Sequence, residues 1–268
     1  MAIFVSSLIR SMDGMEGIAT WVDQLRDPQV GVELIAFTHD EAYWERLEKT
    51  LQGLTCPRTF HGPYVGTEGA CSPDSPEQAH LFASYRRTFY LAERYRAAHV
   101  VYHFTQTTFA ADTAAPVIDK RRHQAEANAL AIQALADEYG VTVLFENLPC
   151  PGTRLPLHTN AQYMAFLDAN PATRTIIDIG HANMNGLDVA SFIERYGPRV
   201  ESYHFHNNDG ERDQHKDIFE GTFDYNAFAP AFRRHTPRAD IVEYEPHVQL
   251  SGAELLARVD YLKRVYLA

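Results

Sequence analysis

The chain has 268 residues, of which 45% are hydrophobic and 22% are charged. This length suits one large domain or two small ones, and this composition supports a sizeable core, which excludes disordered and fibrous proteins. The 24 basic residues are outnumbered by 35 acidic ones, which gives a formal net charge of -11. The surface as a whole therefore repels polyanions, and nucleic acid is disfavoured as a partner.

The N-terminus and the cysteines indicate a cytoplasmic protein that does not span a membrane. No apolar run approaches the roughly 20 residues that a membrane helix needs. The first basic residue, Arg10, follows the apolar run at residues 2–5, whereas a signal peptide carries its positive charge before that run. Cys56, Cys71 and Cys150 are too scattered for a disulfide framework or a thiolate metal site, as expected in a reducing compartment.

Short runs of β-branched and aromatic residues alternate with longer segments of helical periodicity. The expected strands are residues 3–8, 31–37, 59–64, 99–105, 141–146, 175–179, 202–206 and 240–245. The expected helices are residues 17–26, 41–51, 76–96, 115–139, 161–167, 188–196, 225–234 and 252–266. Eight strands and eight helices in strict alternation predict an α/β fold, a single (β/α)8 TIM barrel over residues 1–268.

A doubly wound open sheet is the competing fold. It is disfavoured because no Gly-rich phosphate-binding turn follows the first expected strand. Residues 149–158 form the most irregular stretch, and they follow the fifth strand on the side where barrel enzymes carry their active sites.

Imidazole and carboxylate side chains gather at the expected strand ends and in the loops that follow them. They are His61, His103, Glu146, Asp178, His181, His204, His206, Asp213, His215, Glu243 and Glu245. One such residue alone is more often a satisfied core residue than a ligand. Several together need a compensating charge, which a divalent cation supplies. Imidazole and carboxylate ligands without thiolates suit zinc, manganese, cobalt or iron(II).

Strand parity separates candidate ligands from their neighbours, because residues two apart point to the same face. His204 and His206 should share the interior face, and so should Glu243 and Glu245. We favour His204 and Glu243 as ligands, with His206 and Glu245 as groups that orient the ligands or contact substrate. Glu33, late in the second strand, is expected either to bind substrate or to form an ion pair in the barrel floor.

The motifs follow a fixed order along the chain. They are His-Gly-Pro-Tyr at 61–64, Glu-Asn at 146–147, Asp-Ile-Gly-His at 178–181, His204, Asn-Asp-Gly at 208–210, Asp-Gln-His at 213–215, Glu-Gly-Thr at 220–222 and Glu243. In this order the sequence resembles the xylose-isomerase-like TIM-barrel superfamily. That superfamily holds sugar isomerases and epimerases together with apurinic-site endonucleases of the endonuclease IV type.

The resemblance implies two ligand sets. The four ligands that isomerases and epimerases place around one divalent ion correspond to Glu146, Asp178, His204 and Glu243. The further ligands with which the endonuclease type holds two more zinc ions correspond to His61, His103, His181, Asp213 and His215. The expected cofactor is therefore zinc, manganese, cobalt or magnesium, with one to three ions per chain.

The leading hypothesis is a metal-dependent isomerase or epimerase of a sugar or related polyhydroxy carbonyl compound. Such an enzyme would transfer a proton through a metal-stabilised enediolate. Glu146 and Glu243 would lie on opposite faces of the substrate carbon, one removing a proton and the other returning one. Expected substrate contacts are His181, His206, Glu245, Tyr64 and Glu33. The resemblance also implies a homo-oligomer.

The alternative is a zinc-dependent phosphodiester hydrolase of the endonuclease IV type. Against it, His-Phe-Thr at 103–105 replaces the endonuclease His-Pro-Gly, and Val-Gly-Thr-Glu at 65–68 replaces an Asn-Leu-Ala-like segment. Both segments line the DNA groove in those enzymes, and phosphate contacts normally come from clustered Lys and Arg. A third, non-enzymatic interpretation is a metal-stabilised barrel that senses a sugar.

Overall fold

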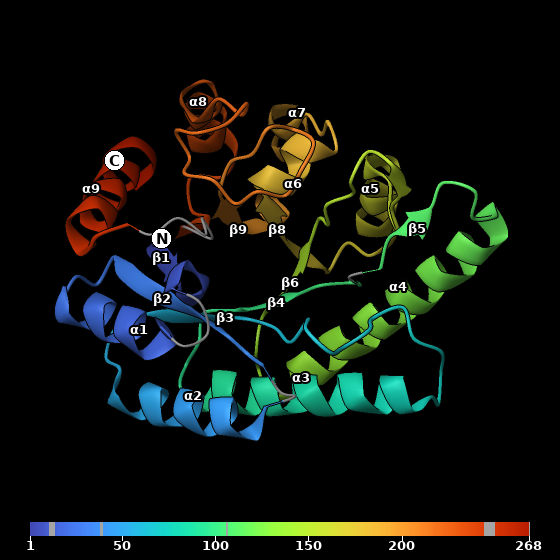
Figure 1. Ribbon diagram of the computed structural model, residues 1–268, viewed down its shortest axis with the longest axis horizontal. Coiled ribbons are helices and arrows are strands. Elements are labelled where there is room, and N and C mark those ends of the chain that lie inside the picture. Colours follow the sequence, from blue (N-terminus) through green and yellow to red (C-terminus); the bar gives the residue numbers. More distant parts are fainter. Residues whose placement is uncertain (11–13, 38–39, 106, 244–249, 268) are drawn as a thin grey trace.

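A closed barrel of parallel strands forms the centre of the molecule (Figure 1). The computed structural model describes residues 1–10, 14–37, 40–105, 107–243 and 250–267. The barrel strands are β1 (Ile3–Ser6), β2 (Val30–Ile35), β3 (Arg58–His61), β4 (Val100–Tyr102), β6 (Val143–Glu146), β8 (Arg174–Asp178), β9 (Val200–Phe205) and β10 (Asp240–Glu243). Each strand pairs in parallel with its neighbour, and β1 closes the ring against β10. The predicted TIM barrel is confirmed.

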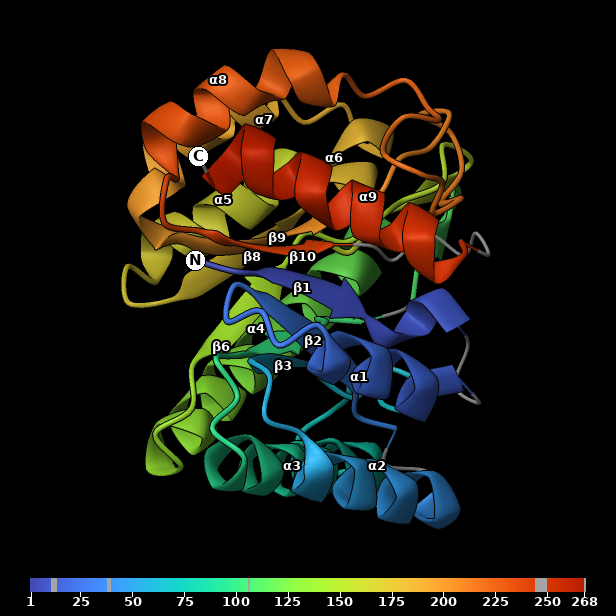
Figure 2. The ribbon, with the colours of Figure 1, turned by 90° about the vertical axis from the view of Figure 1, so that its left-hand side faces the viewer.

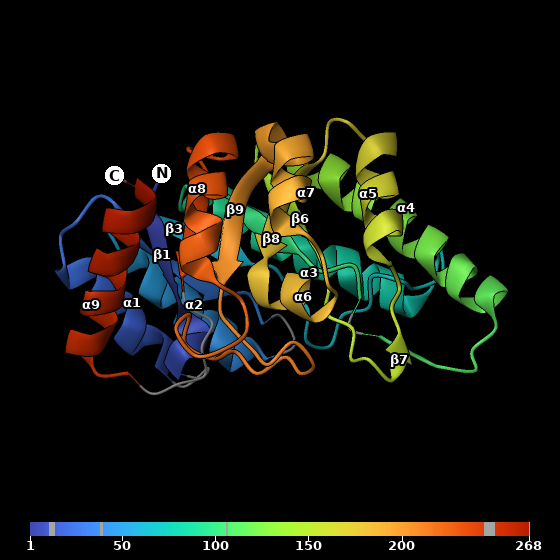
Figure 3. The same ribbon diagram turned by 90° about the horizontal axis from the view of Figure 1, so that it is seen from above.

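Helices surround the strands and alternate with them (Figure 2). They are α1 (Met15–Gln24), α2 (Glu41–Gly53), α3 (Pro76–Arg94), α4 (Ala115–Glu138), α5 (Asn160–Ala169), α7 (Val189–Tyr196), α8 (Tyr225–His235) and α9 (Gly252–Leu262). Seen from above, α1 and α9 lie at one end of the molecule and α4 and α5 at the other (Figure 3). None of the described helices is long and apolar enough to cross a membrane.

Side-chain hydrogen bonds cap the N-termini of most of these helices, near the helix starts that the sequence predicts. Ser75 accepts the backbone N–H of Gln78 ahead of Pro76, and Thr159 forms a capping box with Gln162. The helices then bury one apolar face against the barrel, as α2 does with Trp44 and its neighbours. The elements therefore follow from local signals in the sequence.

Within the described residues, five short elements have no counterpart among the expected ones. They are two 3-10 turns (Ser7–Arg10 and Gly197–Arg199), a helix α6 (Ile179–Met184), and two strands, β5 (Phe109–Ala110) and β7 (Arg154–Leu155), which pair antiparallel. Strands of two residues leave no periodicity to detect. Helix α6 is hidden because Asp178 both ends β8 and caps the helix. The expected irregular stretch at 149–158 contains β7.

Candidate metal centre

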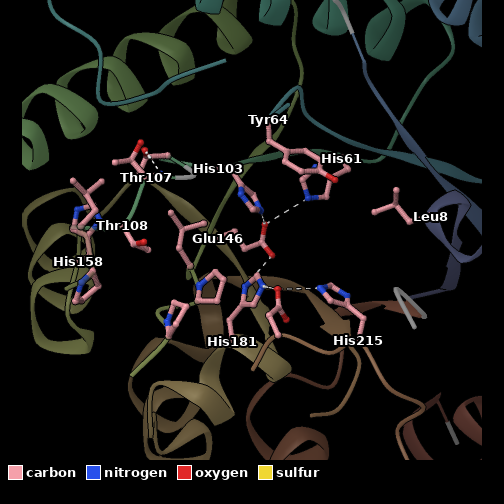
Figure 4. Close-up of a pocket in the computed structure, with 17 residues that line it drawn as sticks. Leu8, His61, Tyr64, His103, Thr107, Thr108, Glu146, His158, His181 and His215 are labelled. Carbon is pink, nitrogen blue, oxygen red and sulfur yellow. Dashed lines mark hydrogen bonds and ion pairs between the residues drawn. The ribbon is translucent and has the colours of Figure 1, made fainter. Parts of the chain in front are cut away.

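A cavity of about 530 Å³ opens at the C-terminal ends of the barrel strands, a typical size for a small-molecule site (Figure 4). His61 and Glu146 reach it from the ends of β3 and β6, and His103 follows β4. The loop after β9 contributes Asp213 and His215. Since parallel strands bring their carboxyl ends to one rim, these distant residues share one pocket.

Glu146 lies at the centre of the polar cluster, with only 1% of its side chain exposed. Its Oε2 lies 2.5 Å from His103 Nε2, and its Oε1 lies 2.9 Å from His204 Nδ1. His61 Nε2 is 3.8 Å from Oε2. Burial raises the pKa of Glu146, but the imidazoles of His103 and His204 outweigh it and hold that pKa well below its usual range. Glu146 is therefore a carboxylate at neutral pH.

Asp178 links the cluster to the short helix that follows β8. Its Oδ1 accepts the backbone N–H of His181 at 2.7 Å and so caps α6, while the His181 ring donates from Nδ1 to the Asn147 carbonyl at 2.9 Å. Its Oδ2 lies 2.9 Å from His206 Nε2 and 3.7 Å from His204 Nδ1. Burial raises the pKa of Asp178, yet the imidazoles of His181 and His206 lower it below its usual value.

Asp213 and His215 complete the cluster from a long loop. Asp213 Oδ2 lies 3.4 Å from His181 Nε2 and 3.1 Å from His215 Nε2. The His215 ring stacks on His206 with centroids 3.9 Å apart. Burial lowers the pKa of His181, but Asp178 and Asp213 outweigh it and raise that pKa to about 10.

The donor set fits divalent cations. Among the described side chains, three groups bring ligand atoms within 4.8 Å of one another: Glu146 with Asp178 and His204; Glu146 with His61 and His103; and Asp213 with His181, His206 and His215. Buried carboxylates need positive charge, and without a cation bound protons supply it, as the raised pKa of His181 indicates for that ring. Imidazole nitrogens and carboxylate oxygens would let a cation replace those protons.

The remaining predicted residues fall into three places. Tyr64 lines the cavity, and its ring packs on His61 at 4.7 Å between centroids. Glu33 and His206 are fully buried and are not among the lining residues. Glu243 ends β10, but its side chain lies outside the described part of the chain, as does the whole of Glu245.

One wall of the cavity includes the loop at residues 149–158, as expected, but its pairing with the loop after β4 was not anticipated. The β5–β7 pair joins the loops after β4 and β6, and it brings Thr107, Thr108 and His158 to the rim (Figure 4). Arg154 Nη2 donates to the Thr108 carbonyl at 2.5 Å and ties the two loops together. The structure also places His206 in a metal-compatible group. Strand parity put His206 on the interior face, but only the fold shows what it meets there.

Solved structures with the same fold cover nearly the whole chain. A D-tagatose 3-epimerase-like protein has a TM-score of 0.74 at 19% identity, with 100% of both chains covered. D-allulose 3-epimerase from Methylomonas sp., in complex with D-allulose, has a TM-score of 0.72 at 14% identity, covering 99% of this chain and 98% of that one. The IolI protein with a binding zinc atom has a TM-score of 0.73 at 13% identity, again with 100% of both chains covered.

The sequence comparisons agree with this fold. Among curated proteins, none matches the sequence significantly. Residues 8–264 match the family described as xylose isomerase-like TIM barrel. The chain therefore belongs to the xylose isomerase-like TIM barrel family.

Proposed function

We propose that the protein is a divalent-metal-dependent isomerase or epimerase of a sugar or related polyhydroxy carbonyl compound. The observation that carries the proposal is the convergence of Glu146, Asp178 and His204 on one point beside the cavity. The epimerases among the solved structures of this fold support the choice of substrate class.

The metal ligands that we propose are Glu146, Asp178, His204 and Glu243, around one zinc, manganese, cobalt or magnesium ion. A bound divalent cation would polarise the substrate carbonyl and stabilise the negative charge that develops beside it. Glu146 is buried, lines the cavity and is ionised, so it can accept a proton from a substrate carbon. We assign return of a proton on the opposite face to Glu243, with Glu245 beside it as a substrate contact.

Further residues would hold the substrate against these carboxylates. His181 lines the cavity and can donate to a substrate oxygen, and Tyr64 offers a ring face to the sugar. His206 and Glu33 lie deeper, so we propose that they orient other side chains and do not touch the substrate.

The cavity walls favour an uncharged substrate. Among the described residues that line the cavity, none is lysine or arginine. A phosphate group is normally held by such cations, by a metal ion or by a helix N-terminus. The hydroxyls of Thr105, Thr107 and Thr108 instead offer neutral hydrogen-bonding groups to a polyol.

A zinc-dependent phosphodiester hydrolase is the second candidate, and one observation favours it. The groups around His103 and around Asp213 add ligands that a single-metal isomerase does not require. Their presence would suit three zinc ions, with His61, His103, His181, Asp213 and His215 as the additional ligands.

Metal analysis followed by an activity panel tests the proposal. The purified protein should contain about one divalent ion per chain by plasma mass spectrometry. It should also exchange a C–H proton for deuterium in D-allulose, D-tagatose or L-ribulose, the sugars named for solved structures of this fold, and it should lose that exchange after chelation. Three zinc ions together with nicking of abasic DNA would instead establish the hydrolase.

The cellular setting and the assembly are proposed on the same basis. The three cysteines are free, as in a protein of the reducing cytoplasm. We propose one domain over residues 1–268 and a homo-oligomer that binds a small sugar-like molecule, with nucleic acid as the disfavoured partner.

A further inference from the structure

Glu33 is a buried carboxylate that the proposed reaction does not use. It lies on β2 inside the barrel, with no exposed surface, and it does not line the cavity. Its Oε1 lies 3.1 Å from His204 Nε2. Within the described residues, its Oε2 has no hydrogen-bond partner. A buried carboxylate lowers the stability of the fold unless it is paired, and the pairing of Glu33 is with His204. We therefore ask what Glu33 does for the His204 ring.

His204 stands between two acidic groups, and each ring nitrogen faces one of them. Nδ1 points to the proposed metal ligands, at 2.9 Å from Glu146 Oε1 and 3.7 Å from Asp178 Oδ2. Nε2 points the opposite way, to Glu33. The neutral ring has only one N–H, so the acceptor at one nitrogen decides which nitrogen keeps a lone pair.

The plane of the His204 ring is also fixed, by a stacked neighbour. His61 stacks on His204 with the two planes 7° apart and the centroids separated by 5.6 Å. Both residues that direct the ring, Glu33 and His61, come from neighbouring strands in fixed register, where Ile35 pairs with His61. The ring therefore has little freedom to turn its other nitrogen toward Glu146.

We propose that Glu33 is a positioning residue. It accepts the Nε2–H of His204 and thereby directs the Nδ1 lone pair at a divalent cation held with Glu146 and Asp178. The inference rests on the proposed function, because it requires a metal at this group. It replaces the expected substrate contact of Glu33 with an action through His204, an arrangement in which a carboxylate raises the basicity of a ligating imidazole.

The test is zinc affinity, measured by titrating the metal-free protein in competition with a chromophoric chelator. The key variant is Glu33→Gln, which keeps the shape and a hydrogen-bond acceptor but removes the charge. Zinc should bind this variant about 10- to 100-fold more weakly than it binds the unchanged protein. Glu33→Leu, which also removes the acceptor, should lose at least as much affinity.

Thr59→Val is the matched control. Thr59 is fully buried, pairs with Glu33 in the β2–β3 register, and has no side-chain hydrogen bond within the described residues. This variant should bind zinc with unchanged affinity. Thermal melts of the metal-free variants check folding: a merely structural Glu33 would lower the melting temperature and leave the affinity of the folded protein unchanged.

Two results overturn the inference and can be told apart. If the unchanged protein binds zinc and Glu33→Gln binds it equally well, the positioning role is wrong and the proposed function stands. If the unchanged protein takes up no zinc, manganese or cobalt, the proposed function fails, and the positioning role fails with it.

Discussion

Two layers of the barrel interior differ sharply although they lie on the same strands. The lower layer is apolar and contains Phe4, Val101, Leu144, Ile176 and Val242. Two residues further along three of these strands, the interior positions become polar, in the pairs Val101 and His103, Leu144 and Glu146, and Ile176 and Asp178. One layer closes the barrel by packing, and the other holds buried carboxylates and imidazoles, which we propose bind a metal ion.

This difference has a practical meaning for mutations. Changes in the lower layer should act on the free energy of unfolding, and changes in the upper layer should act on metal binding and turnover. Each strand can contribute to both layers, because its side chains alternate between the two faces and every second one points to the barrel interior. The following experiments aim at that separation, from the largest expected effect to the smallest.

Glu146→Gln should have the largest effect. Replacing the carboxylate removes the proposed base and a ligand, so turnover should fall by about 10²- to 10⁴-fold. The measurement is the rate of solvent deuterium incorporation, with metal content determined on the same sample. Glu93→Gln, an exposed change on α3, is the control and should leave both values unchanged. Full activity in Glu146→Gln would contradict the assignment.

Leu144→Ala tests the lower layer, two residues away on the same strand. Loss of a buried leucine should lower the free energy of unfolding by about 2–5 kcal/mol. Urea unfolding of the metal-free protein measures it, and zinc affinity should change little. A loss of zinc affinity as large as that of Glu146→Gln would mean that the two layers are not separable.

The stability of the metal-free protein should depend on pH through His181. Its pKa rises from 6.5 to about 10 on folding, so its stabilising contribution is complete below pH 6.5 and is lost as the pH rises toward 10. Unfolding midpoints measured across this range should fall in the unchanged protein, and the fall should be smaller in His181→Gln. Zinc affinity should change in the other direction and rise with pH, because bound metal displaces protons. Unfolding midpoints that do not change with pH would show that the carboxylates do not hold a proton on the His181 ring.

Arg154→Ala should have the smallest effect, because it changes the rim and not the interior. The change removes the hydrogen bonds from Arg154 to Thr108 that tie the β5–β7 wall together. At about 1 kcal/mol for such a contact, KM should rise about fivefold with kcat unchanged. Steady-state kinetics measure KM and kcat separately. A fall in kcat alone would place Arg154 in the chemical step.

The sequence by itself determined the barrel and the strand ends at which the candidate site residues lie. Periodicity and helix caps are local properties, so all eight barrel strands and the helices between them were predictable, with ends shifted by a few residues. Glu146 and Asp178 could be found because each ends a strand, and barrel strands present their ends to one rim.

Only the tertiary structure decided how the side chains meet. Parity placed His204 and His206 on one face, but their partners come from strands and loops far away in the sequence, and contacts at that range carry no local pattern. The same is true of Glu33, whose two expected roles were indistinguishable until closure of the barrel brought it against His204. Strand periodicity predicts which way a side chain points, but closure of the barrel determines which side chains it faces there.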